Sequence, residues 1–316
     1  MRVGGGTAIS TWIDLVRTLV EPLAGAIRIA YLMTDGRNEH DPPAALDEAV
    51  ARAIGVFQCD ARGVGADWSV RELDKIASVL LGDVDIIKRP DEMERDFLEF
   101  MDRAIGKTVP DVRLRMWTPR GSTVRFLRQV APTIEDLGEG ARIDPLTVDY
   151  PTGAWAGEES RDYHLCVDVP PGEVGDEKLA ARVSVVVGED AVASGLVRAV
   201  WTDDLERSTR LNARVARYAR QEEAAEVIRE GLEARREGDF GLATAKLARA
   251  VELVEAAGNE GTLKLLRQVV EVDDDGTVKV KRHIEEDDAK EVLLGSRRTV
   301  RVRKPSPGGI VEEAKR

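Results

Sequence analysis

Apolar residues in the first third of the chain alternate between two spacings. Over residues 8–23 they recur every three or four positions, which predicts an amphipathic helix. Residues 27–33 form a short, nearly continuous apolar run, which is typical of a strand buried on both faces. The alternation continues, with predicted helices at 44–54, 69–81 and 91–105 and predicted strands at 55–59 and 84–87. Helices that alternate with strands predict a parallel sheet covered on both faces.

The apolar spacing changes to two after Gly106. Val112, Leu114 and Met116 show this alternation, and so do several later segments up to Trp201. Clusters of proline and glycine separate these segments, as turns separate strands. Short alternating strands joined by turns predict an antiparallel β-sandwich or barrel.

The chain becomes helical and highly charged beyond Asp203. Two predicted helices, 222–237 and 242–257, flank Gly238, and a third covers about 261–270. The first two resemble a single tetratricopeptide-type hairpin, although such units normally occur in arrays. A helical bundle packed against the rest of the chain is the alternative interpretation. After a short predicted strand at 277–282, the polar composition from Glu285 onward predicts a mostly disordered tail.

These patterns divide the chain into four regions and predict a multidomain fold of the α/β, β and α classes in succession. We expect a partial doubly wound parallel sheet over 1–106 and a β-sandwich over 107–204. A helical region is expected over 205–272, and a short strand followed by the tail over 273–316.

Composition narrows the classes of function. A formal net charge of −12 argues against a general nucleic-acid binder, because phosphate contacts require a basic surface. The chain has 2 cysteines, far apart, which fits a reducing cytoplasm better than a disulfide framework. No apolar run approaches the length of a membrane span, so no membrane partner is expected.

Two motifs point to one candidate site. Gly4-Gly5-Gly6-Thr7 is a glycine-rich loop that opens the first predicted helix, and Thr34-Asp35-Gly36 directly follows the strand at 27–33. Open parallel sheets bind ligands at the carboxyl ends of their strands. A threonine hydroxyl and an aspartate carboxylate at that edge are hard oxygen ligands, suited to Mg²⁺ or Mn²⁺.

These motifs resemble those of the von Willebrand factor type A family. The resemblance rests on the loop Gly5–Ile9, on Ile29–Gly36, and on Cys59–Gly65 followed by a helix, and it covers roughly residues 3–106. It implies that Thr7 and Asp35 coordinate the divalent cation of a metal-ion-dependent adhesion site. It also implies a protein partner, with an acidic partner residue completing the site. The later segments are similar to the region that accompanies this domain in bacterial, especially actinobacterial-type, proteins.

The chain departs from the family at its start. Family members begin with a strand that ends in Asp-x-Ser-x-Ser and supplies further metal ligands, whereas only six residues precede Thr7. We therefore expect an N-terminally truncated domain with an incomplete metal site, weak or no cation binding by this chain, and a bare apolar edge on the strand at 27–33.

Three functions remain open. The preferred prediction is a cytoplasmic adaptor of the von Willebrand factor type A class that binds proteins and is not an enzyme. The alternative is a structural adaptor that binds through the sandwich and helices without metal. The remote alternative is a metal-dependent hydrolase, with Asp35 and Asp41 as ligands and His40 as general base.

Overall fold

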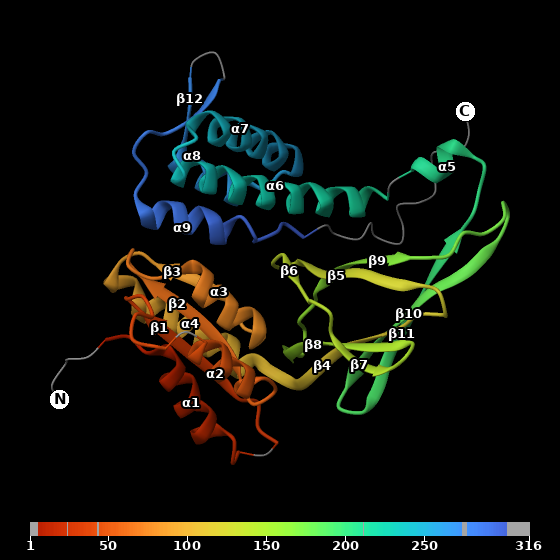
Figure 1. Ribbon diagram of the computed structural model, residues 1–316, viewed down its shortest axis with the longest axis horizontal. Coiled ribbons are helices and arrows are strands. Elements are labelled where there is room, and N and C mark those ends of the chain that lie inside the picture. Colours follow the sequence, from red (N-terminus) through yellow and green to blue (C-terminus); the bar gives the residue numbers. More distant parts are fainter. Residues whose placement is uncertain (1–5, 24, 43, 211, 274–276, 302–316) are drawn as a thin grey trace.

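The computed structural model describes residues 6–23, 25–42, 44–210, 212–273 and 277–301. Figure 1 shows three parts: a layered α/β part, a β-sandwich beside it, and a helical part that lies along both. No helix in these ranges is long and apolar enough to cross a membrane.

The α/β part is built on a three-stranded parallel sheet of order β1-β2-β3. Its elements are α1 (Ile9–Val20), β1 (Ile29–Thr34), α2 (Ala45–Ala53), β2 (Gln58–Val64), α3 (Val70–Val79), β3 (Val84–Ile87), a 3₁₀ turn (Pro90–Glu92) and α4 (Met93–Gly106). In register, Ile29 lies opposite Gln58, and Ala61 lies opposite Val84. The predicted parallel sheet is therefore confirmed.

Helices cover both faces of this sheet. Leu32 of β1 belongs to one buried cluster with Ile13 of α1 and Ile76 of α3. Tyr31, the next residue back along β1, projects to the opposite face, because successive strand side chains alternate. There its ring packs against Phe100 of α4, with ring centroids 4.5 Å apart. Two-sided burial explains why the strand reads as a continuous apolar run.

The outer side of β1 is an edge of the sheet. Within the described residues, β1 pairs only with β2. Apolar side chains are exposed on α1 (Trp12, Leu15 and Leu19) and on α4 (Phe97 and Leu98), the two helices that cover opposite faces of the sheet. An unpaired strand edge with exposed apolar residues on both covering helices is a surface prone to association.

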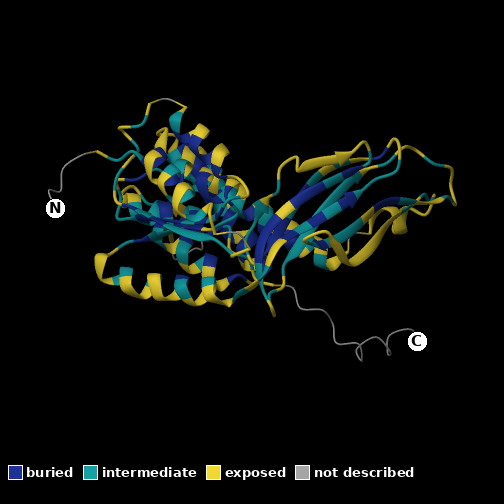
Figure 2. Ribbon diagram, turned by 90° about the horizontal axis from the view of Figure 1, so that it is seen from below, coloured by how far each residue is buried: buried dark blue, intermediate teal, exposed yellow. Residues whose placement is uncertain are grey.

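The sandwich consists of two antiparallel sheets, as predicted. Its strands are β4 (Lys107–Trp117), β5 (Thr123–Ala131), β6 (Glu135–Asp136), β7 (Ala141–Asp144), β8 (Thr147–Ala156), β9 (Asp162–Asp168), β10 (Glu177–Val187) and β11 (Asp190–Val200). The sheet orders are β11-β10-β4-β8-β7 and β6-β5-β9. Leu114, Leu127 and Tyr150 form the core between them. Figure 2 shows buried residues along the middle strands and exposed ones toward the outer edge.

The helical part follows the sandwich. Its helices are α5 (Leu205–Thr209), α6 (Ala213–Arg236), α7 (Phe240–Ala257), α8 (Glu260–Val269) and α9 (Glu286–Gly295). Between α8 and α9 lies a two-stranded sheet of β12 (Val270–Val272) and β13 (Val278–Val280). Helices α6 and α7 pack closely because Gly231 has no side chain. A Cβ atom built there would lie 2.8 Å from Leu247 Cγ. Asp239 and Asn259 cap the starts of α7 and α8.

The predicted disorder is wrong for residues 286–301. Val292 and Leu294 of α9 are buried, and Leu294 joins the core of the α/β part. Beyond the helix, the Ile134 amide donates to the Arg297 carbonyl, and the Thr299 amide donates to the Pro132 carbonyl. The polar composition hides this order, because the few apolar residues are buried by distant parts of the chain. The rest of the predicted tail, 302–316, lies outside the described residues, as do residues 274–276.

Candidate functional site at the carboxyl edge of the parallel sheet

Thr7 and Asp35 lie together at the carboxyl edge of the parallel sheet. Both line one open hollow of about 540 Å³. A Cβ atom built on Gly36 would lie 3.1 Å from the Thr7 hydroxyl oxygen, so this oxygen lies against the turn that follows β1. The remainder of the lining comes from the same two loops and from the loop after β2: Gly6, Arg37, Glu39, His40 and Asp67. Gly4 and Gly5 of the glycine-rich motif lie outside the described residues.

The loop after β1 holds the start of α1 in place. The Ile9 amide donates to Asn38 Oδ1 at 2.9 Å, and the Ser10 amide donates to Asp41 Oδ2 at 2.8 Å. The Ser10 hydroxyl donates to Asp41 Oδ1 at 2.5 Å. Burial alone would raise the pKa of Asp41, but these hydrogen bonds from Ser10, together with one from Asn38, hold it below its ordinary value. Asp41 therefore serves as an N-terminal anchor for α1.

The turn at Gly36 is fixed by Thr34. The buried Thr34 hydroxyl donates to the Gly36 carbonyl at 3.0 Å and accepts from the Gly36 amide at 3.3 Å. This local ring aims the next side chain, Asp35, outward, and Asp35 is exposed. Within the described chain the Asp35 carboxylate has no hydrogen bond or ion pair, so it is free to meet a ligand.

The opposite wall is formed by the loop after β2, which is closely packed. Trp68 is 1% exposed, and its indole donates to the Gly65 carbonyl at 2.8 Å. A Cβ atom built on Gly63 would overlap the Trp68 ring at 1.9 Å, so this position requires glycine. The Lys290 ammonium of α9 lies 4.9 Å over the same ring. The C-terminal helix thus supports the loop that carries Asp67 to the hollow.

Comparison with solved structures decides the family. A structure described as von Willebrand factor type A from Catenulispora acidiphila is similar with a TM-score of 0.90 and 45% sequence identity, over 95% of this chain and 72% of that chain. This chain belongs to the von Willebrand factor type A family. The model of the von Willebrand factor type A C-terminal domain matches residues 252–292. The resemblance predicted from the sequence is confirmed.

More distant structures are also similar. The ArnB paralog VWA2 from Sulfolobus acidocaldarius is 13% identical, over 94% of this chain and 71% of that chain, with a TM-score of 0.48. The human COPII-coat protein Sec24c is 12% identical, over 94% of this chain and 42% of that chain, with a TM-score of 0.48. No curated protein matches this chain significantly.

The two predicted ligands of this von Willebrand factor type A protein do not by themselves fill the coordination shell of a divalent cation. Thr7 and Asp35 offer one hydroxyl and one carboxylate, whereas Mg²⁺ takes about six oxygens in near-octahedral geometry. Among the residues with a described position, no three acidic, histidine or cysteine side chains are placed to share a metal. Asp41 is engaged by Ser10, so its use as a hydrolase ligand would uncap α1.

Two acidic members of the hollow in this von Willebrand factor type A protein were not among the predicted site residues, although one of them, Glu39, belongs to the polar loop that follows Asp35 in the sequence. Glu39 and Asp67 line it beside Asp35, and within the described residues neither side chain has a hydrogen bond or an ion pair. Their position in the sequence could have indicated them, because each lies in a loop that follows a parallel strand. Together with Asp35, these two residues give the described rim more unpaired carboxylates than cationic side chains. Arg37 is the cationic residue that lies nearest to them along the chain.

Proposed function

We propose that this protein is a protein–protein interaction module of the cytoplasm, not an enzyme, and that its partner contacts the rim formed by Thr7, Asp35, Glu39 and Asp67. The observation that supports this most is the open hollow at the carboxyl edge, lined by carboxylates without partners in the described chain. Loops at this edge of an open parallel sheet are where such folds bind their ligands. Membership of a family that generally serves interaction or adhesion agrees with this.

A more specific form of the proposal includes a bound divalent metal ion. A Mg²⁺ or Mn²⁺ ion would bridge Thr7 and Asp35 to an acidic side chain of the partner, which would supply further oxygens. Charge attraction in a partly dry site would then contribute affinity. Partner binding at the rim does not itself require a metal, since the free carboxylates can pair with basic groups of the partner directly.

Partner capture tests the rim. A purified chain carrying Asp35→Ala with Asp67→Ala is expected to lose most of its specifically retained partner, because two unpaired carboxylates leave the contact surface. Quantitative mass spectrometry of pull-downs measures the loss. Glu139→Ala is the matched control, because Glu139 is an exposed acid in the sandwich without a partner in the described chain. Equal retention by the double variant and wild type would exclude the rim.

Titration calorimetry tests the metal. Mg²⁺ or Mn²⁺ added to the wild-type chain is expected to give no saturable heat below about 1 mM, because two donors do not replace the hydration shell of the ion. A version that carries the family's Asp-x-Ser-x-Ser strand ahead of the glycine loop should bind, and Asp35→Ala should then abolish binding. Tight binding to the wild-type chain would contradict our view of the donor set.

One observation favours the metal-independent adaptor as a second candidate. β11 forms the edge of the five-stranded sheet and is exposed along nearly its whole length, including Val192, Leu196 and Val200. An exposed apolar edge strand can accept a strand from a partner. If capture survives a chelator and the rim variant but is lost on Leu196→Asp, the sandwich is the contact surface.

A further inference from the structure

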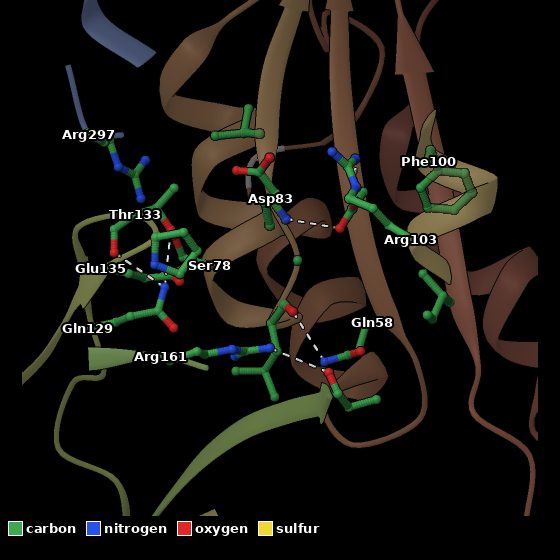
Figure 3. A pocket seen from close by; sticks show the side chains of 18 of the residues that line it. Gln58, Ser78, Asp83, Phe100, Arg103, Gln129, Thr133, Glu135, Arg161 and Arg297 are labelled. Atoms are coloured by element: carbon green, nitrogen blue, oxygen red, sulfur yellow. Dashed lines mark hydrogen bonds and ion pairs between the residues drawn. The ribbon is translucent and has the colours of Figure 1, made fainter. Parts of the chain in front are cut away.

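A second cavity lies at the opposite edge of the parallel sheet, where the three parts of the molecule meet. Its volume is about 470 Å³, within the range of pockets that bind small molecules. Figure 3 shows residues of different parts facing one another across it: Gln58 and Asp83 from the α/β part, Gln129 and Glu135 from the sandwich, and Arg297 from the segment after α9. A molecule bound here would contact all three parts at once.

Each described basic side chain of the lining already has an acidic partner. Arg161 pairs with Glu159 at 2.7 Å, and Lys107 pairs with the same carboxylate at 2.8 Å. Arg103 lies 3.5 Å from Asp60. Arg297 and Arg298 pair with Asp74 and Asp85. The cavity therefore offers no unpaired cation of its own to an incoming anion.

The acids are not all neutralised. The Glu135 carboxylate, on β6, has no hydrogen bond or ion pair within the described residues. Among the residues that the structure describes, Asp83 forms an ion pair only with Arg62, at 3.9 Å. Burial raises the pKa of Glu135 to about 7, and the negative charges of Asp83 and Asp74 raise it further while Arg297 and Arg161 oppose the shift. Glu135 and Asp83 are therefore the described acids of the lining that have no close counter-ion.

Neutral acceptors surround these acids. The Gln129 amide group donates to Thr133, at 3.1 Å to the hydroxyl, which leaves its carbonyl oxygen available. Ser78 of α3 lines the same space, and its hydroxyl has no partner in the described chain. A carboxylate, an amide oxygen and a hydroxyl together suit the three N–H donors of an ammonium group.

We propose that this cavity binds a small organic cation with a primary amino or guanidino group, which pairs with Glu135 and takes Asp83 as a second anchor. The acids do not gather as a metal site: no group of three or more acidic, histidine or cysteine ligands occurs in the described ranges. The volume also exceeds what a single ion needs, so an elongated amine fits the space better.

The test is calorimetric titration of the full chain with putrescine and with agmatine at about pH 8, where Glu135 is ionised. Saturable binding to the wild type is expected, and 1,4-butanediol, which has the length of putrescine without its charge, should not bind. Glu135→Gln should weaken binding by roughly 10- to 100-fold, the factor for a charged hydrogen bond. Asp136→Asn is the matched control, because this neighbour on β6 is exposed and pairs with Arg128.

The dependence on pH separates a binding role of Glu135 from a structural one. Because the bound cation favours the carboxylate, affinity should fall as the pH is lowered from about 8 to about 6, and binding near pH 7 should release protons. Proton release appears as a heat that varies with the buffer. In Glu135→Gln this dependence should disappear. The variant should fold, because glutamine mimics the neutral acid, and without ligand its Tm at pH 8 should exceed that of the wild type.

Two results would overturn the proposal. One is the absence of saturable binding of both amines to the wild type at millimolar concentration. The other is a folded Glu135→Gln variant, verified by its Tm, that binds either amine as tightly as the wild type does. Because the rim variants leave this cavity intact, failure here leaves the proposed interaction surface untouched.

Discussion

Replacing Asp96 by alanine is expected to lower the free energy of unfolding by about 3 to 5 kcal/mol, the cost of removing the carboxylate that is hydrogen-bonded to a buried charge. The charge is that of Arg62, which is 1% exposed in the middle of β2. Asp96 of α4 accepts from Arg62 Nε at 3.2 Å and also from the Tyr31 hydroxyl. Burial and the neighbouring Asp96 raise the pKa of Tyr31, so the phenol stays a donor.

Arg62 has a second, more distant carboxylate in Asp83, at 3.9 Å, and its other hydrogen-bond partners are uncharged. Backbone carbonyls of Ala61 and Asp83 accept from the same guanidinium at 2.9 and 3.2 Å, but they carry no charge. Urea denaturation followed by circular dichroism measures the loss. Asp91→Ala, an exposed acid just before α4, should change stability by less than about 0.5 kcal/mol. A loss below about 1 kcal/mol for Asp96→Ala would mean that Asp83 takes over as counter-ion.

Lys290→Ala is the second substitution with a large expected effect, about 2 to 4 kcal/mol, because two carbonyls under α9 would lose their donor. The Lys290 ammonium, buried at the interface, donates to the Trp68 carbonyl at 2.8 Å and to the Ala66 carbonyl. Lys290 is 7% exposed, so its stem is buried as well. Hydrogen exchange of α9 and of the loop after β2 should rise together, because each covers the other.

Two variants control this prediction. Lys290→Met keeps the length of the stem and should recover part of the packing but none of the hydrogen bonds. Lys279→Ala removes an exposed lysine of the same region and should leave hydrogen exchange in α9 unchanged. If exchange of the loop after β2 stays at its wild-type rate in Lys290→Ala, the helix does not support the rim.

Local pattern was enough to predict the parallel sheet and, with the family resemblance, the proximity of the candidate ligands. The apolar run at 27–33 indicated a strand buried on both faces, and β1 lies between α1 and α4. Ser69 was recognisable as a cap by its spacing to Glu72, whose amide donates to its hydroxyl at 3.3 Å. Asp35 could be placed at the carboxyl edge because it directly follows a predicted parallel strand, and Thr7 by the glycine-rich motif and the family resemblance.

Long-range contacts could not be predicted in this way. In the sequence, Lys290 is one of several charged residues of an acidic helix, and nothing in that pattern indicates that it is buried. Its burial depends on a loop more than two hundred positions earlier. Glu135 lies in a two-residue strand, which has no periodicity to detect. The cavity around it exists only because three parts meet, and no single segment carries a signal for it.

The burial of Leu294 in the core of the parallel sheet has a consequence for synthesis on the ribosome. Helix α4 ends at Gly106, and the whole sandwich and helices α6 to α8 must be translated before Leu294 emerges. At about 5 to 20 residues per second, the nascent sheet waits roughly ten to forty seconds for its last core side chain. During that interval its exposed apolar surface can bind chaperones, and the parallel-sheet part is completed only after the sandwich and most of the helical part have been made.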